Sequence, residues 1–144
     1  MINERNNAAE VSSDILAPVL FGHAEQIAFI LRSIKTNKIP NAWLFHGPIG
    51  IGKASLALNV ANILSNIDLT KPECGSGISE IDIRKPKTSV NLNNVFHFKR
   101  KWDDKKKVFQ KYISIDDIRH LNKRFSLSSA DHSYKVCVID TTED

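Results

Sequence analysis

The chain has 144 residues, of which 42% are hydrophobic and 25% charged, and its formal net charge is +4. This composition is ordinary for one globular domain. No apolar run approaches the ~18 residues that a membrane helix needs, and the polar start of the chain does not fit a secretory signal. We therefore expect a cytoplasmic protein without membrane contact.

The first half of the chain predicts a tail followed by a helix, a strand and a second helix. Residues 1–17 are expected to form a loose tail. Over residues 23–35, apolar residues recur at i, i+3, i+4 and i+7 and predict an amphipathic helix: Ile27, Ile30, Leu31 and Ile34. The run 42–46 predicts a short buried strand. Residues 53–64 are apolar on most sides and predict an interior helix.

The second half repeats the alternation of strand and helix after a long, weakly patterned loop over residues 66–94. Residues 95–98 predict a strand, and Ser114-x-x-Asp117 is a variant capping box that predicts a helix beginning there. The unbroken apolar run before Asp140 predicts a parallel strand covered on both faces, with Cys137 buried in it. This alternation predicts an α/β layered fold.

One motif carries chemistry. Residues 47–53 match the pattern G-x-x-x-x-G-K between a predicted strand and a predicted helix. Such a loop turns backbone N–H groups toward phosphate oxygens, and the helix N-terminus adds positive charge. The candidate nucleotide-binding residues are Gly47, Pro48, Ile49, Gly50, Ile51, Gly52, Lys53, Ala54 and Ser55, with Lys53 reaching the β- and γ-phosphates. The alternative is a glycine-rich turn that merely connects strand to helix.

The metal ligands of a working P-loop are only partly present. The position after the lysine normally holds Ser or Thr, whose hydroxyl binds Mg²⁺. Here it holds Ala54, and Ser55 does not substitute because one step along a helix rotates the side chain by about 100°. Asp140 ends a run with the form of a Walker B strand, whose aspartate holds Mg²⁺. A helix N-cap is the alternative role for Asp140, and Mg²⁺ binding stays open.

A strongly basic stretch lies between the predicted strand at 95–98 and the helix at Ser114. Its candidate DNA-contacting residues are Lys99, Arg100, Lys101, Lys105, Lys106 and Lys107. Such a stretch, interleaved with aromatic residues, could hold phosphates and stack bases. The alternative is a solvated surface loop that Asp103 and Asp104 partly neutralise.

Several segments together resemble the AAA+ clamp-loader subunits of bacterial DNA polymerase III, of the delta-prime type. The resemblance covers about residues 19–144, which would be the N-terminal part of an AAA+ P-loop nucleotide-binding domain spanning 18–144. The segments that carry it are Leu20-Phe21-Gly22-His23, residues 40–45, the loop 47–53, and residues 101–105, 112–119 and 138–144.

The resemblance implies a three-layer P-loop fold with a parallel sheet, and places Val19, Leu20, Phe21 and Gly22 near the adenine of a nucleotide. It implies other loader subunits, of the tau/gamma and delta types, as partners, and primed DNA through the assembled complex. Many relatives carry a four-cysteine zinc module after the P-loop helix. Cys74 is the only cysteine in that region, so we expect no zinc.

The chain departs from active AAA+ ATPases at two positions. These enzymes usually have Asp-Glu at the end of the acid strand, whereas Thr141 follows Asp140 here, and Ala54 replaces the metal-binding hydroxyl. We therefore expect a stator-like, non-hydrolysing clamp-loader subunit that binds ATP or ADP weakly if at all. The alternatives are an active P-loop ATPase or small-molecule kinase, or a nucleic-acid-binding module that uses the basic stretch alone.

The resemblance also predicts an incomplete sheet. In AAA+ proteins one strand lies between the P-loop strand and the acid strand, and another covers the far side of the P-loop strand. The sequence ends at Asp144 without either. We therefore expect a marginally stable fold, or strand exchange with another copy.

Overall fold

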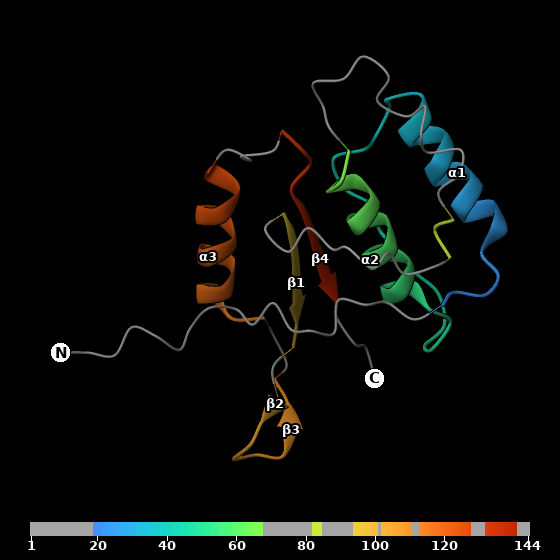
Figure 1. The fold of residues 1–144 in the computed structure, drawn as a ribbon. Helices are drawn as coiled ribbons and strands as arrows, with labels where there is room; N and C mark the ends of the chain where they lie inside the picture. The colour runs from blue at the N-terminus through green and yellow to red at the C-terminus, as the bar shows by residue number, and fades with distance from the viewer. Residues whose placement is uncertain are drawn as a thin grey trace.

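The computed structural model describes residues 19–67, 82–84, 94–100, 102–110, 113–127 and 132–140. In chain order its elements are α1 (Ala24–Lys35), α2 (Lys53–Leu64), β1 (Val95–Lys99), β2 (Trp102–Asp103), β3 (Val108–Phe109), α3 (Ile115–Ser126) and β4 (Val136–Asp140) (Figure 1). β1 and β4 pair in parallel, with Val95 opposite Val136 and Lys99 opposite Asp140. The predicted α/β class is confirmed.

The two parallel strands separate α2 from α3, which lie on opposite faces of the pair (Figure 1). Successive side chains of a strand point to opposite faces. Val95 and Val138 pack into one cluster with Leu58 and Ala61 of α2. Phe96 points the other way and meets Phe125 of α3, with ring centroids 5.7 Å apart. The strands are therefore the middle layer of an α/β/α arrangement.

The larger core lies between α1 and α2. The buried apolar residues that these helices contribute to it are Ile27, Ile30, Ile34, Leu56, Val60, Ile63 and Leu64. The predicted amphipathic face of α1 is confirmed, and so is the interior position of α2. Burial of this kind is the main favourable term in folding, at about 25 cal/mol per Å² of apolar surface.

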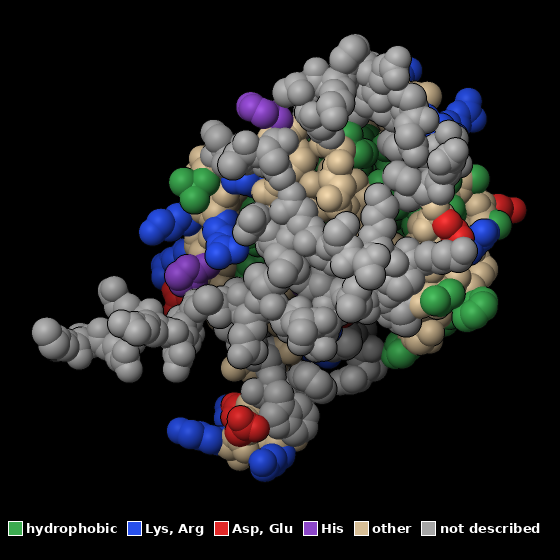
Figure 2. Space-filling model, in the orientation of Figure 1, with side chains coloured by type: hydrophobic (Ala, Val, Ile, Leu, Met, Phe, Trp, Pro, Cys, Tyr) green, Lys and Arg blue, Asp and Glu red, His purple; other side chains and the backbone are tan. Residues whose placement is uncertain are grey.

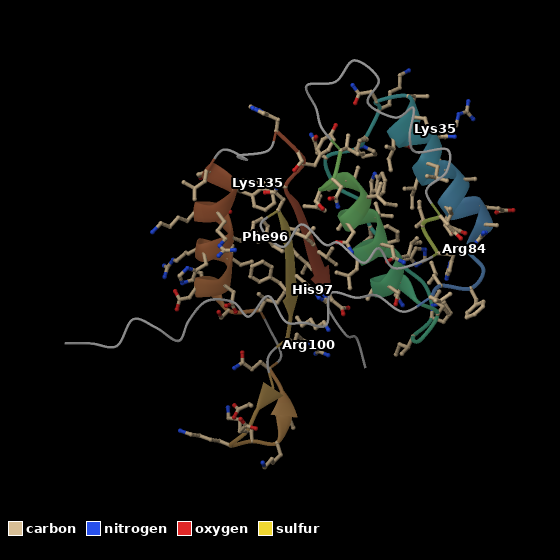
Figure 3. The ribbon with its side chains drawn as sticks, in the orientation of Figure 1. Lys35, Arg84, Phe96, His97, Arg100 and Lys135 are labelled. Atoms are coloured by element: carbon tan, nitrogen blue, oxygen red, sulfur yellow. The ribbon has the colours of Figure 1, made fainter. Side chains whose placement is uncertain are left out.

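The helix α3 begins as its capping box predicts but is held loosely. The Ser114 hydroxyl accepts a hydrogen bond from the Asp117 backbone N–H at 3.1 Å. At the other end, the Lys135 ammonium donates to the carbonyl oxygens of Arg124, at 2.8 Å, and Leu127. Figure 3 shows Lys135 close to this end of α3 and Phe96 between the strands and the helix. No described residue of α3 is fully buried.

Two predictions about the strands are wrong. Residues 42–46 form no ladder, because among the described strands none lies beside them to complete the backbone hydrogen bonds. Trp43 and Phe45 are half-buried against the α1–α2 core, whereas Leu44 is 92% exposed. β4 is not covered on both faces, since Ile139 is 53% exposed and Cys137 is only half-buried. The loosely packed α3 leaves that face partly open.

The predicted tail at 1–17 and most of the predicted loop at 66–94 lie outside the described residues. None of the three helices in the described part of the chain has the length and apolarity that crossing a bilayer requires.

Candidate nucleotide-binding site

The glycine-rich loop forms the turn that leads into α2. Gly50 and Gly52 have φ of 80° and 92°, a region that L-residues with a side chain rarely adopt, and Gly52 is the N-cap of the helix. Residues 47–51 are exposed to solvent. The N-terminus of α2, with its unpaired N–H groups, therefore adjoins an open loop, which is the arrangement that anion binding needs.

Lys53, the first residue of α2, folds back over this loop. Its ammonium donates to the carbonyl oxygens of Gly47 at 2.8 Å and Pro48 at 2.7 Å. The loop itself therefore engages two of the three N–H groups of the ammonium. A phosphate group bound at the loop would compete with these two carbonyl oxygens for the N–H donors of Lys53.

A strap formed by residues 19–23 crosses the end of the loop. Its buried member is Leu20, whose N–H donates to the Arg84 carbonyl at 2.9 Å. A Cβ added at Gly52 would lie 2.7 Å from the Leu20 Cδ1 atom, so leucine and loop are in close contact. His23 Nε2 lies 2.6 Å from the Ile51 carbonyl oxygen. Because a carbonyl only accepts, Nε2 carries the proton in this contact.

The structure thus brings the expected adenine-side segment against the loop. Leu20 and His23 face the loop, whereas Val19, Phe21 and Gly22 are exposed to solvent. Beside the loop lies an open hollow of about 670 Å³ between α1 and residues 42–46, with Phe29, Trp43 and Lys53 among its lining residues. Its lining also includes the side chains of His23 and His46, so the hollow is partly basic.

Asp140 ends β4 at the same end of the layers at which α2 begins (Figure 1). On the neighbouring strand, His97 places Nε2 3.8 Å from the Asp140 Oδ2 atom, and the His97 side chain is only 5% exposed (Figure 3). Burial, and then the positive charge of Lys99, lowers the pKa of His97, while Asp140 opposes this shift. Nε2 has no hydrogen-bond partner among the described residues.

The residues do not make up a complete P-loop magnesium site. Ala54, the second residue of α2, offers a methyl group where a hydroxyl oxygen is needed, and Ser55 is half-buried. Within the described ranges, no group of three His, Cys, Asp or Glu residues lies close enough together to hold a metal ion. Thr141 and Cys74 lie outside the described residues, so the expectations that rest on them stay predictions.

The basic stretch contains a hairpin that the sequence reasoning missed. β2 and β3 pair antiparallel, with Trp102 opposite Phe109 and Asp103 opposite Val108. Lys105, Lys106 and Lys107 occupy its turn, while Lys99 and Arg100 precede it and Lys101 lies outside the described residues. The available signal was the β-forming Trp102, Val108 and Phe109 on either side of a polar turn. The contact of His23 with Ile51 had no local signal.

A comparison with protein-family models gives a match over most of the chain. A family model described as "DNA polymerase III, delta subunit" matches residues 22–144, which include the loop, α2 and every strand that the structure describes. The comparisons with curated proteins and with solved structures gave no significant match.

Proposed function

The chain belongs to the DNA polymerase III, delta subunit family, and from this membership we propose that it is a clamp-loader subunit of the delta-prime type. It is a clamp-loader-type domain with a role in DNA replication. Within the loader it acts as a stator: it assembles in the cytoplasm with subunits of the tau/gamma and delta types and helps the complex place the sliding clamp on primed DNA. It does so without hydrolysing ATP.

The observation that carries the non-hydrolysing role is the state of the nucleotide loop. The loop and the helix N-terminus that could cradle phosphates are formed, but Ala54 replaces the hydroxyl that would hold Mg²⁺. Lys53 is engaged by two loop carbonyls. Phosphoryl transfer depends on a metal ion to neutralise the developing charge. Binding of ATP or ADP is therefore weak, and turnover is absent.

ATP turnover by the purified chain, with Mg²⁺ and with or without DNA, tests this proposal. We expect no release of phosphate above background. Binding of a fluorescent ATP analogue should be weak and should weaken further in Lys53→Ala, whereas Lys38→Ala, an exposed lysine in the turn after α1, should bind as the wild type does. Turnover near ~1 s⁻¹ that is lost in Lys53→Ala would instead identify an active ATPase or kinase.

The assembly role is tested separately by mixing the chain with loader subunits of the tau/gamma and delta types. Size-exclusion chromatography should show stoichiometric incorporation that needs no ATP hydrolysis. Lys53→Ala should still assemble, because the stator role does not use the phosphate contact. A chain that stays unassociated at micromolar concentration of every subunit would refute the proposed role.

A further inference from the structure

The β2–β3 hairpin is an arm that extends away from the layered body of the protein (Figure 1). Its turn spans residues 104–107, all of them exposed. The turn is closed by the Lys107 N–H, which donates to the Asp103 carbonyl oxygen at 2.8 Å. Three successive lysines, Lys105, Lys106 and Lys107, therefore stand at the tip of a projecting, ordered element. Figure 2 shows basic side chains spreading outward from this tip.

Within the described residues, the nearby aspartates form no ion pairs with these lysines. The Asp103 carboxylate accepts hydrogen bonds from the backbone N–H groups of Lys105, at 3.0 Å, and Lys106, at 3.1 Å. It thereby stabilises the turn through the backbone. In the described part of the chain, none of the three lysine side chains has an ion-pair or hydrogen-bond partner, and neither has Asp104.

The third lysine occupies a backbone position that favours glycine or asparagine. Lys107 has φ of 55°, in the left-handed region. A side chain there costs roughly 1–2 kcal/mol relative to the ordinary conformation. A strained residue at an exposed tip gains nothing from burial, so the observation points to a use for its charge.

Resting on the proposed role at primed DNA, we propose that the β2–β3 hairpin is a DNA-binding arm whose Lys105, Lys106 and Lys107 contact the sugar–phosphate backbone. Lysine is a common phosphate ligand, and such contacts carry no sequence preference. A protein partner fits less well, because the cores of protein interfaces are depleted in lysine and need apolar anchors. Among the described side chains of the arm, only Val108 is apolar and exposed.

The test is fluorescence anisotropy of a labelled primed duplex, titrated with the full chain between 50 and 200 mM salt. The triple variant Lys105→Ala/Lys106→Ala/Lys107→Ala should bind at least about tenfold more weakly at the lowest salt. Its plot of log K against log salt should flatten by about 0.9 for each phosphate contact that is lost. A matched control removes the same charge from the end of α1 and the turn that follows: Arg32→Ala/Lys35→Ala/Lys38→Ala. It should keep at least half of the wild-type affinity and the wild-type salt slope.

Two further variants separate charge from structure. The triple Lys→Arg variant of the arm should bind DNA as the wild type does, because the charges remain. Lys107→Gly should melt at the same temperature as the wild type or higher, since glycine relieves the left-handed strain, and yet should bind DNA more weakly. Lys107→Gly with unchanged DNA affinity would show that the lysine serves the turn alone, and would overturn this part of the proposal.

The outcomes distinguish this proposal from the role in the loader. Equal losses in the arm and α1 triple variants would mean that only net charge matters, and would overturn the arm. The arm variant could also bind DNA normally and yet fail to join the other loader subunits. That result would overturn the DNA-binding arm in favour of an arm that docks on protein. Specific loss of DNA binding in a chain that never joins the loader would support the arm and refute the assembly role.

Discussion

Substitution of Gly52 by alanine should destabilise the protein through two separable effects. Gly52 has φ of 92°, and an alanine in the left-handed region costs about 1–2 kcal/mol. The new Cβ would also lie 2.7 Å from the Leu20 Cδ1 atom, so one of the two groups must move. Full burial of a leucine contributes about 1.5–3 kcal/mol, and partial displacement of Leu20 should forfeit roughly 1–2 kcal/mol of this. We expect a total loss of about 2–4 kcal/mol.

Gly22→Ala is the matched control. Gly22 has φ of 80°, but a Cβ there would meet nothing within 4 Å. The control therefore reports the backbone strain without the steric contact, and should cost about 1–2 kcal/mol. Urea unfolding followed by circular dichroism, with equal m-values for all variants, gives the free energies of unfolding. The difference between the two alanine variants measures the contact between loop and strap.

A double-mutant cycle assigns that difference to Leu20. Leu20→Ala alone should cost about 2–5 kcal/mol, as for other buried leucines. In that background, Gly52→Ala should cost no more than Gly22→Ala does, because the clashing atom is gone. If Gly52→Ala and Gly22→Ala differ by less than ~0.5 kcal/mol in the wild-type background, Leu20 moves aside without loss. The view of residues 19–23 as a packed strap would then be wrong.

Two further predictions concern titratable groups in the strands. Burial lowers the pKa of His97 in the folded state, so the unfolded chain takes up a proton first as the pH falls. The free energy of unfolding should therefore decrease as the pH drops below about 6.5. Chemical denaturation should show a smaller decrease in His97→Gln, and an equal decrease would contradict the assignment to His97. Burial raises the pKa of Cys137 to about 11, so in a Cys74→Ser background its alkylation at pH 8 should be at least about tenfold slower than that of a small free thiol. The rate should keep rising beyond pH 10, and a plateau near pH 9 would refute the raised pKa.

The elements that the sequence predicted well are those set by local rules. The periodic isoleucines of α1 need only one neighbouring helix to bury their face, and the Ser114 cap is satisfied within its own first turn. The G-x-x-x-x-G-K pattern likewise located the turn into α2, because its glycines meet backbone requirements that few other residues can. The existence of these elements follows from residues that lie close together in the chain.

The predictions that failed depend on neighbours that no local pattern specifies. An apolar run such as residues 42–46 indicates burial, but a strand exists only where another strand supplies hydrogen bonds. Ile139 is exposed because α3 packs loosely on this face of the strands. The amphipathic sequence of α3 predicts a helix but does not reveal how closely the helix packs. The hairpin at Lys105 was hidden because each of its strands has only two residues, and the charges of the stretch dominated the pattern.

The candidate site holds its shape through contacts made by the protein itself. Lys53 closes the loop on one side, and Leu20 and His23 hold its other end. A nucleotide that recruits Lys53 would compete with its two exposed hydrogen bonds to the loop carbonyls. Ala54 also lacks the hydroxyl that holds Mg²⁺ in a working P-loop. Under the proposed stator role, a loop held by the protein's own contacts would keep the same shape with or without nucleotide.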